Sequence, residues 1–151
     1  MEDKSNHLSL RKVIDTDESI LFNWANDPDV RKWSFNQNII TLNEHRTWFN
    51  EKLKDSRCSM YLIFCGCTPI GQVRFDDEGD FARIDYSIER QYRGRKLGKR
   101  ILDMAIKKYQ TYSEKILLGE VFPENFASAK IFEALGFSME MNRGNIIYTK
   151  V

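Results

Sequence analysis

Three apolar segments joined by short turns constrain the fold of this chain more than any other feature. Residues 60–65, 70–75 and 81–88 are long enough for strands, and the turns 66–69 and 76–80 separate them. Strands joined by turns this short pair with their neighbours in opposite directions. The middle of the chain is therefore predicted to form an antiparallel meander.

Further strand and helix patterns flank the meander. Before it, the sequence predicts a strand over 8–13, a helix from Asp15 or Thr16 to about Asn26, and a short helix or turn from Pro28 to about Phe35. A further helix is predicted to open with the capping box Thr41-Leu-Asn-Glu44. One stripe of this helix carries Leu42, His45, Phe49 and Leu53. After the meander come a helix from about Leu97, a strand over 115–121, a helix over 125–135 that stops at Gly136, and strands over 137–141 and 146–151. This order predicts one α/β domain over residues 1–151, whose mixed sheet has one parallel crossover in the middle.

Composition limits the classes of partner. The 151 residues carry a formal net charge of +1, which argues against nucleic acid or an anionic membrane as a partner of the whole molecule. Cys58, Cys65 and Cys67 match no disulfide framework, and no second Cys/His pair completes a metal site. The polar first eight residues lack an apolar leader, and no apolar run has transmembrane length. We expect a soluble, cytoplasmic protein without a metal.

A basic, glycine-containing segment lies where the meander leads into the next helix. It reads Arg93-Gly-Arg-Lys-Leu-Gly98 and continues with Lys99 and Arg100. A helix start carries unpaired N–H groups and the positive end of the macrodipole, so each cation there costs about 0.3–1 kcal/mol. An anion bound at the helix start would offset that cost, and glycines allow close approach of the backbone.

Other interpretations of this segment remain. A solvated basic face beside a tight turn would have the same composition, and a nucleic-acid patch is weaker because only Tyr92 accompanies the charges. The spacing excludes a Walker P-loop, since Arg100 stands where Ser or Thr is required. It also excludes a dinucleotide fingerprint, because no G-x-G-x-x-G is present.

Two blocks of the sequence resemble the GNAT acetyltransferases, and the resemblance extends over essentially the full length. That family's acyl-CoA signature is Q/R-x-x-G-x-G/A at a strand-to-helix turn; here Arg93 and Gly98 occupy its ends, and Lys96 replaces the middle glycine. The second block runs from Glu120 through Asn125 to Leu135-Gly136-Phe137. The resemblance implies a GNAT fold with a splayed parallel strand pair in the sheet and helices on both faces.

The N-terminal third is similar to one branch of the family. The segments Asn23-Trp24-Ala-Asn26-Asp-Pro28, Trp33-Ser-Phe35 and His45-Arg-Thr-Trp48-Phe49 resemble the amino-sugar N-acetyltransferases of pseudaminic acid biosynthesis. Ribosomal-protein and antibiotic acetyltransferases share a looser version. The resemblance thus implies transfer of an acetyl group from acetyl-CoA to an amino sugar or a nucleotide-linked amino sugar, by direct attack of the amine on the thioester.

The resemblance also assigns roles to residues. The backbone N–H near Ile88 would polarise the thioester carbonyl, and Glu120 would act as the base, with Asp85 a weaker second candidate. The predicted cofactor-binding residues are Tyr86, Ile88, Arg93, Gly94, Arg95, Lys96, Leu97, Gly98, Lys99, Arg100, Asn125 and Lys130. The predicted acceptor-binding residues are Trp24, Asn26, Trp33 and Phe35, because aromatic rings stack on sugars and bases.

Several of these residues have plain structural alternatives. Glu120 could be a salt-bridged strand end, Asn125 a helix N-cap, and the two tryptophans part of the core. Phe132 stands where most relatives have a tyrosine that protonates the leaving thiolate, and we expect it to be structural. If Gly136 ends the helix in a Schellman motif, Phe132 and Phe137 should touch.

Two further functions remain as alternatives. The chain could acetylate a protein N-terminus or another small amine, or it could be a non-catalytic acyl-CoA-binding module, for which Lys96 and Phe132 are the supporting observations. As partners we expect acetyl-CoA and a small amine acceptor, with neither nucleic acid nor membrane. The protein would be a monomer or a homodimer, since the last strand could pair across a dimer.

Overall fold

The computed structural model describes residues 7–151. Residues 1–6, on which the expectation about an apolar leader mainly falls, lie outside the described part. The strands are β1 (Leu8–Lys12), β2 (Cys58–Cys65), β3 (Thr68–Asp77), β4 (Phe81–Ile88), β5 (Ile116–Val121), β6 (Ser138–Asn142) and β7 (Asn145–Lys150). The helices are α1 (Glu18–Ala25), α2 (Pro28–Lys32), α3 (Leu42–Lys54), α4 (Leu97–Gln110) and α5 (Phe126–Ala134), with short 3-10 helices at Asp15–Asp17 and Arg90–Tyr92.

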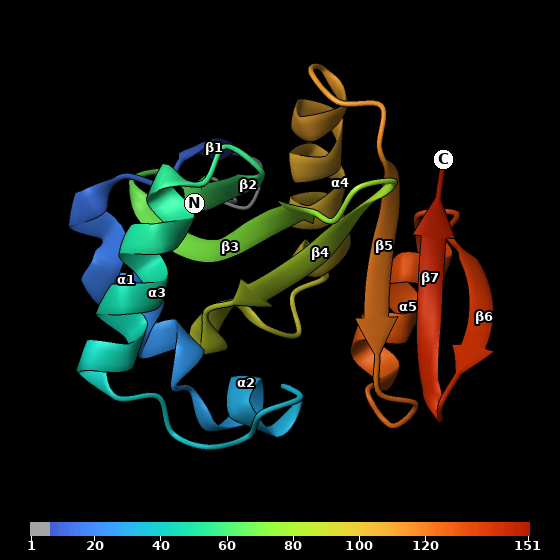
Figure 1. The fold of residues 1–151 in the computed structure, drawn as a ribbon, viewed down its shortest axis with the longest axis horizontal. Coiled ribbons are helices and arrows are strands. Elements are labelled where there is room, and N and C mark those ends of the chain that lie inside the picture. The colour runs from blue at the N-terminus through green and yellow to red at the C-terminus, as the bar shows by residue number, and fades with distance from the viewer. Residues whose placement is uncertain (1–6) are drawn as a thin grey trace.

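The strands form one seven-stranded sheet in the order β1-β2-β3-β4-β5-β7-β6. The pairing of β4 with β5 is parallel and every other pairing is antiparallel, as the order of the elements predicted. Helix α4 makes the crossover that joins the two parallel strands (Figure 1). The α/β fold with a mixed sheet is therefore confirmed.

Helices cover both faces of this sheet, and each face has its own core. Alternation along β2 divides its side chains, so that Tyr61 and Ile63 belong to the core under α4 and α5, whereas Met60 and Leu62 belong to the core under α1 and α3. The second core is smaller and is completed by Val13, Leu21, Trp24 and Phe49. Among residues 7–151, no helix has the length and apolar character needed to cross a membrane.

Capping and turn patterns in the sequence predicted most helix ends correctly. In the capping box of α3, the Glu44 N–H donates to Thr41 Oγ1 (3.2 Å) and the Thr41 N–H donates to Glu44 Oε2 (3.0 Å). Leu42 was wrongly placed on the buried stripe of this helix; it is exposed, whereas His45 and Phe49 are buried. The helix predicted from Asp15 begins as a 3-10 turn, because the Asp17 carboxylate accepts from the Ile14 N–H and pairs with Arg11. Helix α2 ends at Lys32, and a turn and bends continue from there through Phe35, in agreement with the predicted short helix or turn.

The C-terminal end of α5 is a Schellman motif, as predicted. Gly136 has φ of +84°, its N–H donates to the Glu133 carbonyl (3.0 Å), and the Phe137 N–H donates to the Phe132 carbonyl (3.1 Å). The rings of Phe132 and Phe137 meet edge to face with centroids 5.0 Å apart. Both hydrogen bonds and the hydrophobic contact of the motif are therefore present.

Candidate active site

The parallel strands β4 and β5 separate after three paired residues. Their pairing covers Phe81–Arg83 on β4 and Ile116–Leu118 on β5 and then stops, although both strands continue. The Glu89 N–H donates to Ile70 of β3, so alternation turns the N–H groups of Tyr86 and Ile88 away from β3 and toward the gap. The splay predicted for this strand pair is present, and it leaves backbone donors without a strand partner.

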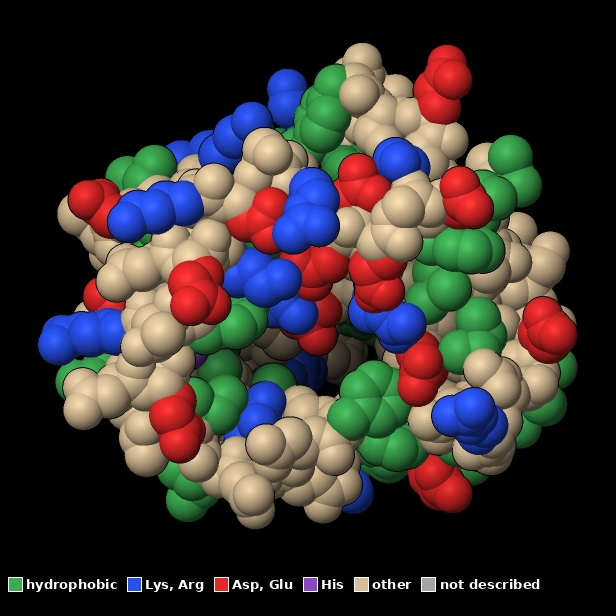
Figure 2. All heavy atoms as spheres, viewed as in Figure 1, with side chains coloured by type: hydrophobic (Ala, Val, Ile, Leu, Met, Phe, Trp, Pro, Cys, Tyr) green, Lys and Arg blue, Asp and Glu red, His purple; other side chains and the backbone are tan. Residues whose placement is uncertain are grey.

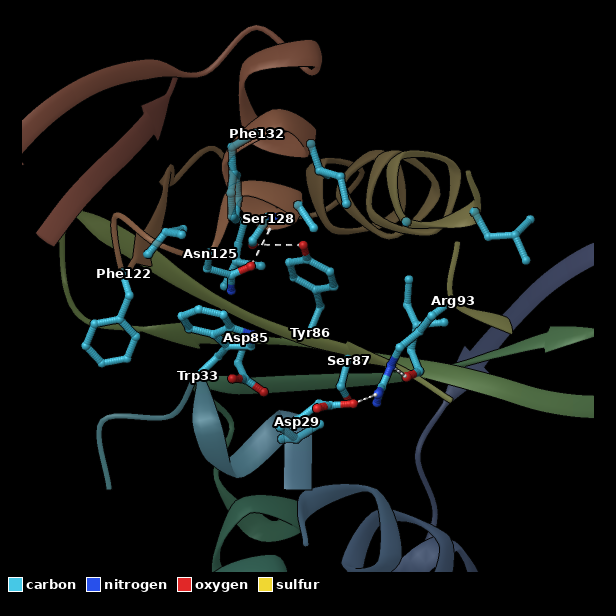
Figure 3. A pocket seen from close by; sticks show the side chains of 18 of the residues that line it. Asp29, Trp33, Asp85, Tyr86, Ser87, Arg93, Phe122, Asn125, Ser128 and Phe132 are labelled. Carbon is cyan, nitrogen blue, oxygen red and sulfur yellow. Dashed lines mark hydrogen bonds and ion pairs between the residues drawn. The ribbon is translucent and has the colours of Figure 1, made fainter. Parts of the chain in front are cut away.

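A cleft of about 530 Å³ occupies this gap. Strand β4 contributes Ile84 to Ile88, and the turn before α4 and the first residues of that helix contribute Arg93, Gly94, Lys96, Leu97 and Gly98. Helix α5 and the loop before it contribute Asn125, Ala127, Ser128, Ile131 and Phe132 (Figure 3). The cleft therefore joins the backbone donors of β4 to the beginnings of two helices, and we call it the strand cleft.

Helix α4 begins at this cleft without a cap. Its N-cap residue, Lys96, makes no side-chain capping hydrogen bond, and its first turn contains no acidic residue. By contrast, α3 and α5 are capped by the side chains of Thr41 and Asn125. The free N–H groups at the start of α4, with a lysine beside them, are suited to hold an anion such as a pyrophosphate.

The two outer glycines of this turn have different roles. Gly94 has φ of +74° and no atom within 4 Å of the position a Cβ would take, so it provides the turn. Gly98 is buried where α4, α5 and β4 meet, and a Cβ there would lie 2.5 Å from Ile131 Cδ1 and 3.3 Å from Ile88 Cδ1. Gly98 also lines the strand cleft, so the predicted approach to a ligand stays open, and in addition this glycine allows the two helices to pack.

A pair of hydroxyl groups lies on the wall of the strand cleft. Tyr86 of β4 points toward α5, and its Oη lies 2.9 Å from Ser128 Oγ (Figure 3). The Ser128 N–H donates to Asn125 Oδ1 (3.3 Å), which confirms the N-cap interpretation of Asn125. Burial raises the pKa of Tyr86 to about 12, so its hydroxyl remains protonated at neutral pH.

Phe132 is buried beside these hydroxyls. Its ring stacks on Tyr148 at 5.3 Å and meets Tyr86 edge to face at 6.1 Å. Gly119 of β5 lies against the same ring, since a Cβ there would be 2.4 Å from Phe132 Cζ. These contacts support the interpretation of Phe132 as structural, and they identify Gly119 as a residue that the sequence analysis missed.

A second cleft, of about 550 Å³, lies between the sheet and helices α1 to α3. We call it the helix cleft. Its sheet wall carries Asp85, Ser87 and Glu120, which line the strand cleft as well. Figure 2 shows a hollow in this view, with acidic and basic side chains gathered along its upper edge. The two clefts therefore meet where β4 and β5 splay apart, at these three shared residues.

Two carboxylates stand at this junction, one on each splayed strand. Continued by two residues, the register that pairs Arg83 with Leu118 sets Asp85 opposite Glu120, with both side chains on the same face. Glu120 Oε1 accepts from Arg83 (3.2 Å) and Oε2 from Asn145 (3.1 Å). Asp85 Oδ2 accepts from Gln72 (3.0 Å), and 53% of its side chain is exposed.

Aromatic rings from two distant segments meet beside the clefts. Phe122, which follows β5, lies with its ring centroid 5.1 Å from that of Phe35 and 6.5 Å from that of Trp33. Trp33 lines both clefts, whereas Phe35, 60% exposed, lines only the helix cleft. The sequence analysis missed Phe122, because only the fold brings residues 33–35 and 122 together.

The geometry agrees with a comparison against models of known protein families. Residues 7–138 match the model described as acetyltransferase (GNAT) domain. The chain belongs to the GNAT acetyltransferase family.

Solved structures with this GNAT fold cover nearly the whole chain at low sequence identity. A spermidine N-acetyltransferase from Vibrio cholerae in complex with CoA and spermine has a TM-score of 0.83 at 16% identity, covering 95% of this chain and 94% of its own. A ribosomal-protein-alanine N-acetyltransferase from Brucella melitensis reaches 0.80 at 14%, with 95% and 99% covered. An aminoglycoside acetyltransferase in complex with coenzyme A reaches 0.78 at 18%, with 94% and 92% covered. A search of curated proteins found no match.

Several residues predicted for the GNAT site have other positions or roles. The Arg93 side chain turns away from α4: its Nε donates to the Ile88 carbonyl (2.8 Å), and its guanidinium pairs with Asp27 and Asp29 of the α2 segment (Figure 3). Lys130 is exposed and lines neither cleft, because the cleft face of α5 carries residues 127, 128, 131 and 132. Arg95, Lys99 and Arg100 are also outside the lining of both clefts, and the Arg95 guanidinium lies over the Tyr92 ring.

The predicted acceptor residues divide in the same way. Trp24 lines the helix cleft but is 8% exposed and belongs to the core under α1 and α3. Asn26 lines neither cleft, because its amide donates to the Ile40 carbonyl and accepts from the Ile40 N–H, both at 2.8 Å. Asn26 therefore holds the segment after α2 in place instead of lining the helix cleft.

Among residues 7–151, no group of three His, Cys, Asp or Glu residues is placed to hold a metal ion.

Proposed function

We propose that this GNAT protein transfers the acetyl group of acetyl-CoA to the amine of a small acceptor, with an amino sugar as the acceptor class. The observation that carries the proposal is the junction of the two clefts at the splayed strands. One cleft offers backbone donors and an uncapped helix start, and the other offers carboxylates and aromatic rings. A thioester in the first cleft and an amine in the second would meet at this junction.

The strand cleft is suited to the pantetheine arm and pyrophosphate of the donor. The turn from Gly94 to Lys96 and the first N–H groups of α4 would hold the pyrophosphate. The N–H groups of Tyr86 and Ile88 face the gap, so they could bind the arm and polarise the thioester carbonyl as its oxygen gains negative charge. Asn125 keeps a free amide nitrogen for the arm, since its Oδ1 caps α5.

The reaction needs no covalent intermediate, because a thioester is already activated. The amine nitrogen attacks the carbonyl carbon, the C–N bond forms, and the C–S bond breaks. The amine loses one proton and the departing sulfur gains one from water, so the products are an amide and free coenzyme A. Only a neutral amine can attack, and Glu120 or Asp85 accepts its proton, directly or through water.

The leaving thiolate meets the Tyr86 side of the cleft. Phe132 has no proton to donate, whereas the Tyr86 hydroxyl lies in the same wall and is already bonded to Ser128. With a pKa of about 12, this hydroxyl is better suited to donate a hydrogen bond to the thiolate than to surrender its proton, because a thiol reference pKa is roughly 8.5. Tyr86 would therefore stabilise the leaving group.

The helix cleft favours a compact acceptor over a peptide. Its volume of about 550 Å³ is that of a small-molecule site. The contacts of Phe122 with Trp33 and Phe35 place a third aromatic ring beside this cleft, whereas a peptide chain needs an open groove. Stacking on exposed aromatic rings suits a sugar ring.

Release of free thiol from acetyl-CoA tests the proposal. The acceptor panel would contain amino sugars, polyamines and peptides with free N-termini, each compared with hydrolysis in the absence of amine. The proposal expects release with amino sugars well above hydrolysis. Turnover only with peptides would favour the protein N-terminal acetyltransferase. Tight coenzyme A binding without turnover of any amine would favour the non-catalytic acyl-CoA-binding module, which Phe132 keeps as the second candidate.

A further inference from the structure

His45 of α3 is a buried side chain whose hydrogen-bonding groups have no partner in residues 7–151. It is 3% exposed, and neither Nδ1 nor Nε2 has a hydrogen-bond partner among the described residues. The rings of Phe22, Trp48 and Phe49 surround it, with centroids at 5.3, 5.5 and 6.0 Å. Natural proteins seldom leave buried polar atoms unpaired, because each such atom has lost its hydrogen bonds to water without replacement.

The imidazole lies at the helix cleft. His45 and Trp48 line this cleft from the helical side, and Asp85 and Glu120 line it from the sheet. A molecule that fills the cleft would therefore place one part beside the carboxylates and another beside His45. The missing partner of the imidazole is then a group on the acceptor.

The charge state of His45 indicates what kind of group this is. Burial lowers the pKa of His45, and the Glu18 carboxylate of α1 opposes that effect less strongly. The ring is therefore neutral at neutral pH, with one nitrogen donating and the other accepting. A hydroxyl group also donates and accepts, so it can pair with either nitrogen of a neutral imidazole, whereas an ammonium group only donates and would leave the ring N–H unpaired.

We propose that His45 forms a hydrogen bond with a hydroxyl group of the acceptor, so that the helix cleft selects hydroxylated amines over polyamines and plain alkyl amines. This proposal rests on the N-acetyltransferase function proposed above and adds the recognition residue for its acceptor. It makes His45 a residue kept for binding at a cost to the stability of the empty protein. Replacing it should therefore move stability and selectivity in opposite directions.

The variant His45→Phe tests both effects. Phenylalanine fits among the neighbouring rings and removes the unpaired nitrogens, so the empty protein should unfold at a higher denaturant concentration. A denaturation midpoint clearly below that of the wild type would overturn the proposal, because it would mean that the imidazole is satisfied within the protein. Trp48→Phe serves as the control, since Trp48 lines the same cleft and is a neighbour of His45.

Selectivity is measured with glucosamine and cyclohexylamine, which share a six-membered ring but differ in hydroxyl groups. For each amine, kcat/KM of the variant is divided by that of the wild type, which cancels the intrinsic reactivity of the amine. His45→Phe should lower this ratio at least tenfold for glucosamine and leave it near one for cyclohexylamine. Trp48→Phe should change both ratios alike.

Binding of coenzyme A separates the possible failures. Both proteins should bind it equally, because His45 does not line the strand cleft. If the wild type turns over neither amine nor any other member of the acceptor panel, the proposed function itself fails. If it turns over glucosamine and His45→Phe changes both ratios equally or neither of them, the proposed function stands and the assignment of His45 is overturned.

Discussion

Lys96 shows how a single residue adapts the family's turn. It has φ of +59°, a conformation that glycine adopts easily and that costs other residues about 1–2 kcal/mol. The family signature has glycine at this position, so the lysine retains the glycine conformation despite its cost. Its place in the strand cleft, at the uncapped start of α4, suits the side chain to the proposed binding of an anion.

Charge reversal at two lysines tests this role. Lys96→Glu should weaken coenzyme A binding at least tenfold, because it puts a negative charge beside the pyrophosphate position. Lys130→Glu, an identical change on the exposed face of α5, should alter affinity less than twofold. Calorimetric titration with coenzyme A measures both, and equal losses in the two variants would argue against the assigned phosphate position.

Gly119 has a role that only the packing of the folded protein shows. A methyl group at this position would approach the buried Phe132 ring to 2.4 Å, so Gly119→Ala should lower the free energy of unfolding by about 1–3 kcal/mol. Urea denaturation measures the loss. In a Phe132→Leu background the same alanine should cost much less, and an undiminished loss there would mean that the ring is not the obstacle.

At the scale of elements, the placement of α2 decides the shape of the acceptor side. This helix has five residues and no buried ones, so it has little packing of its own. Arg93 connects it to β4, by pairing with Asp27 and Asp29 while donating to the Ile88 carbonyl. Trp33 follows α2 directly, and its position therefore depends on these contacts.

Arg93→Ala should detach α2 and disturb the acceptor side. We expect a loss of about 1.5–3 kcal/mol in unfolding free energy, typical of hydrogen bonds to charged groups, and a higher KM for the acceptor. Arg57→Ala is the control, because Arg57 and Asp55 form an exposed ion pair that should contribute little to the unfolding free energy. If both variants lose the same small amount, Arg93 does not hold α2.

The elements also show what the sequence could predict. Strand periodicity, the Thr41 capping box and the Schellman end at Gly136 depend on neighbours in the sequence, and the structure confirms them. The orientation of Arg93 and the pairing of Asn26 with Ile40 depend on contacts between segments that no local pattern encodes. The local motif could therefore indicate the proposed donor site, whereas the surroundings of His45 and Phe122 emerged only from the fold.

At the scale of the whole molecule, the sheet separates two cores and supports two clefts that meet at the splayed strands. The core under α4 and α5 contains most of the buried side chains, and the smaller core under α1 and α3 borders the helix cleft. His45 packs beside that smaller core, so its protonation affects the stability of the entire fold.

Stability should therefore fall as the pH decreases from 7 to 5. The pKa of His45 is lowered in the folded protein, so the unfolded chain binds a proton at this residue more readily. The resulting stabilisation is present above the pKa of the unfolded chain, about 6.5, and is lost as the pH falls below that pKa. Thermal unfolding across this range measures the effect. His45→Phe should show a flatter dependence, and an unchanged slope would assign the effect to other groups.

Binding of coenzyme A is the most direct test of the account as a whole, because every assigned role depends on the strand cleft. A ligand present at 100 times its dissociation constant stabilises the folded state by about 2.7 kcal/mol, which corresponds to a rise in melting temperature of roughly 5–10 °C for a chain of this length. We predict this rise for the wild type and, because a tenfold weaker site leaves only about 1.4 kcal/mol of stabilisation, at most about half of it for Lys96→Glu at the same concentration. No shift for the wild type, even at millimolar coenzyme A, would contradict the account.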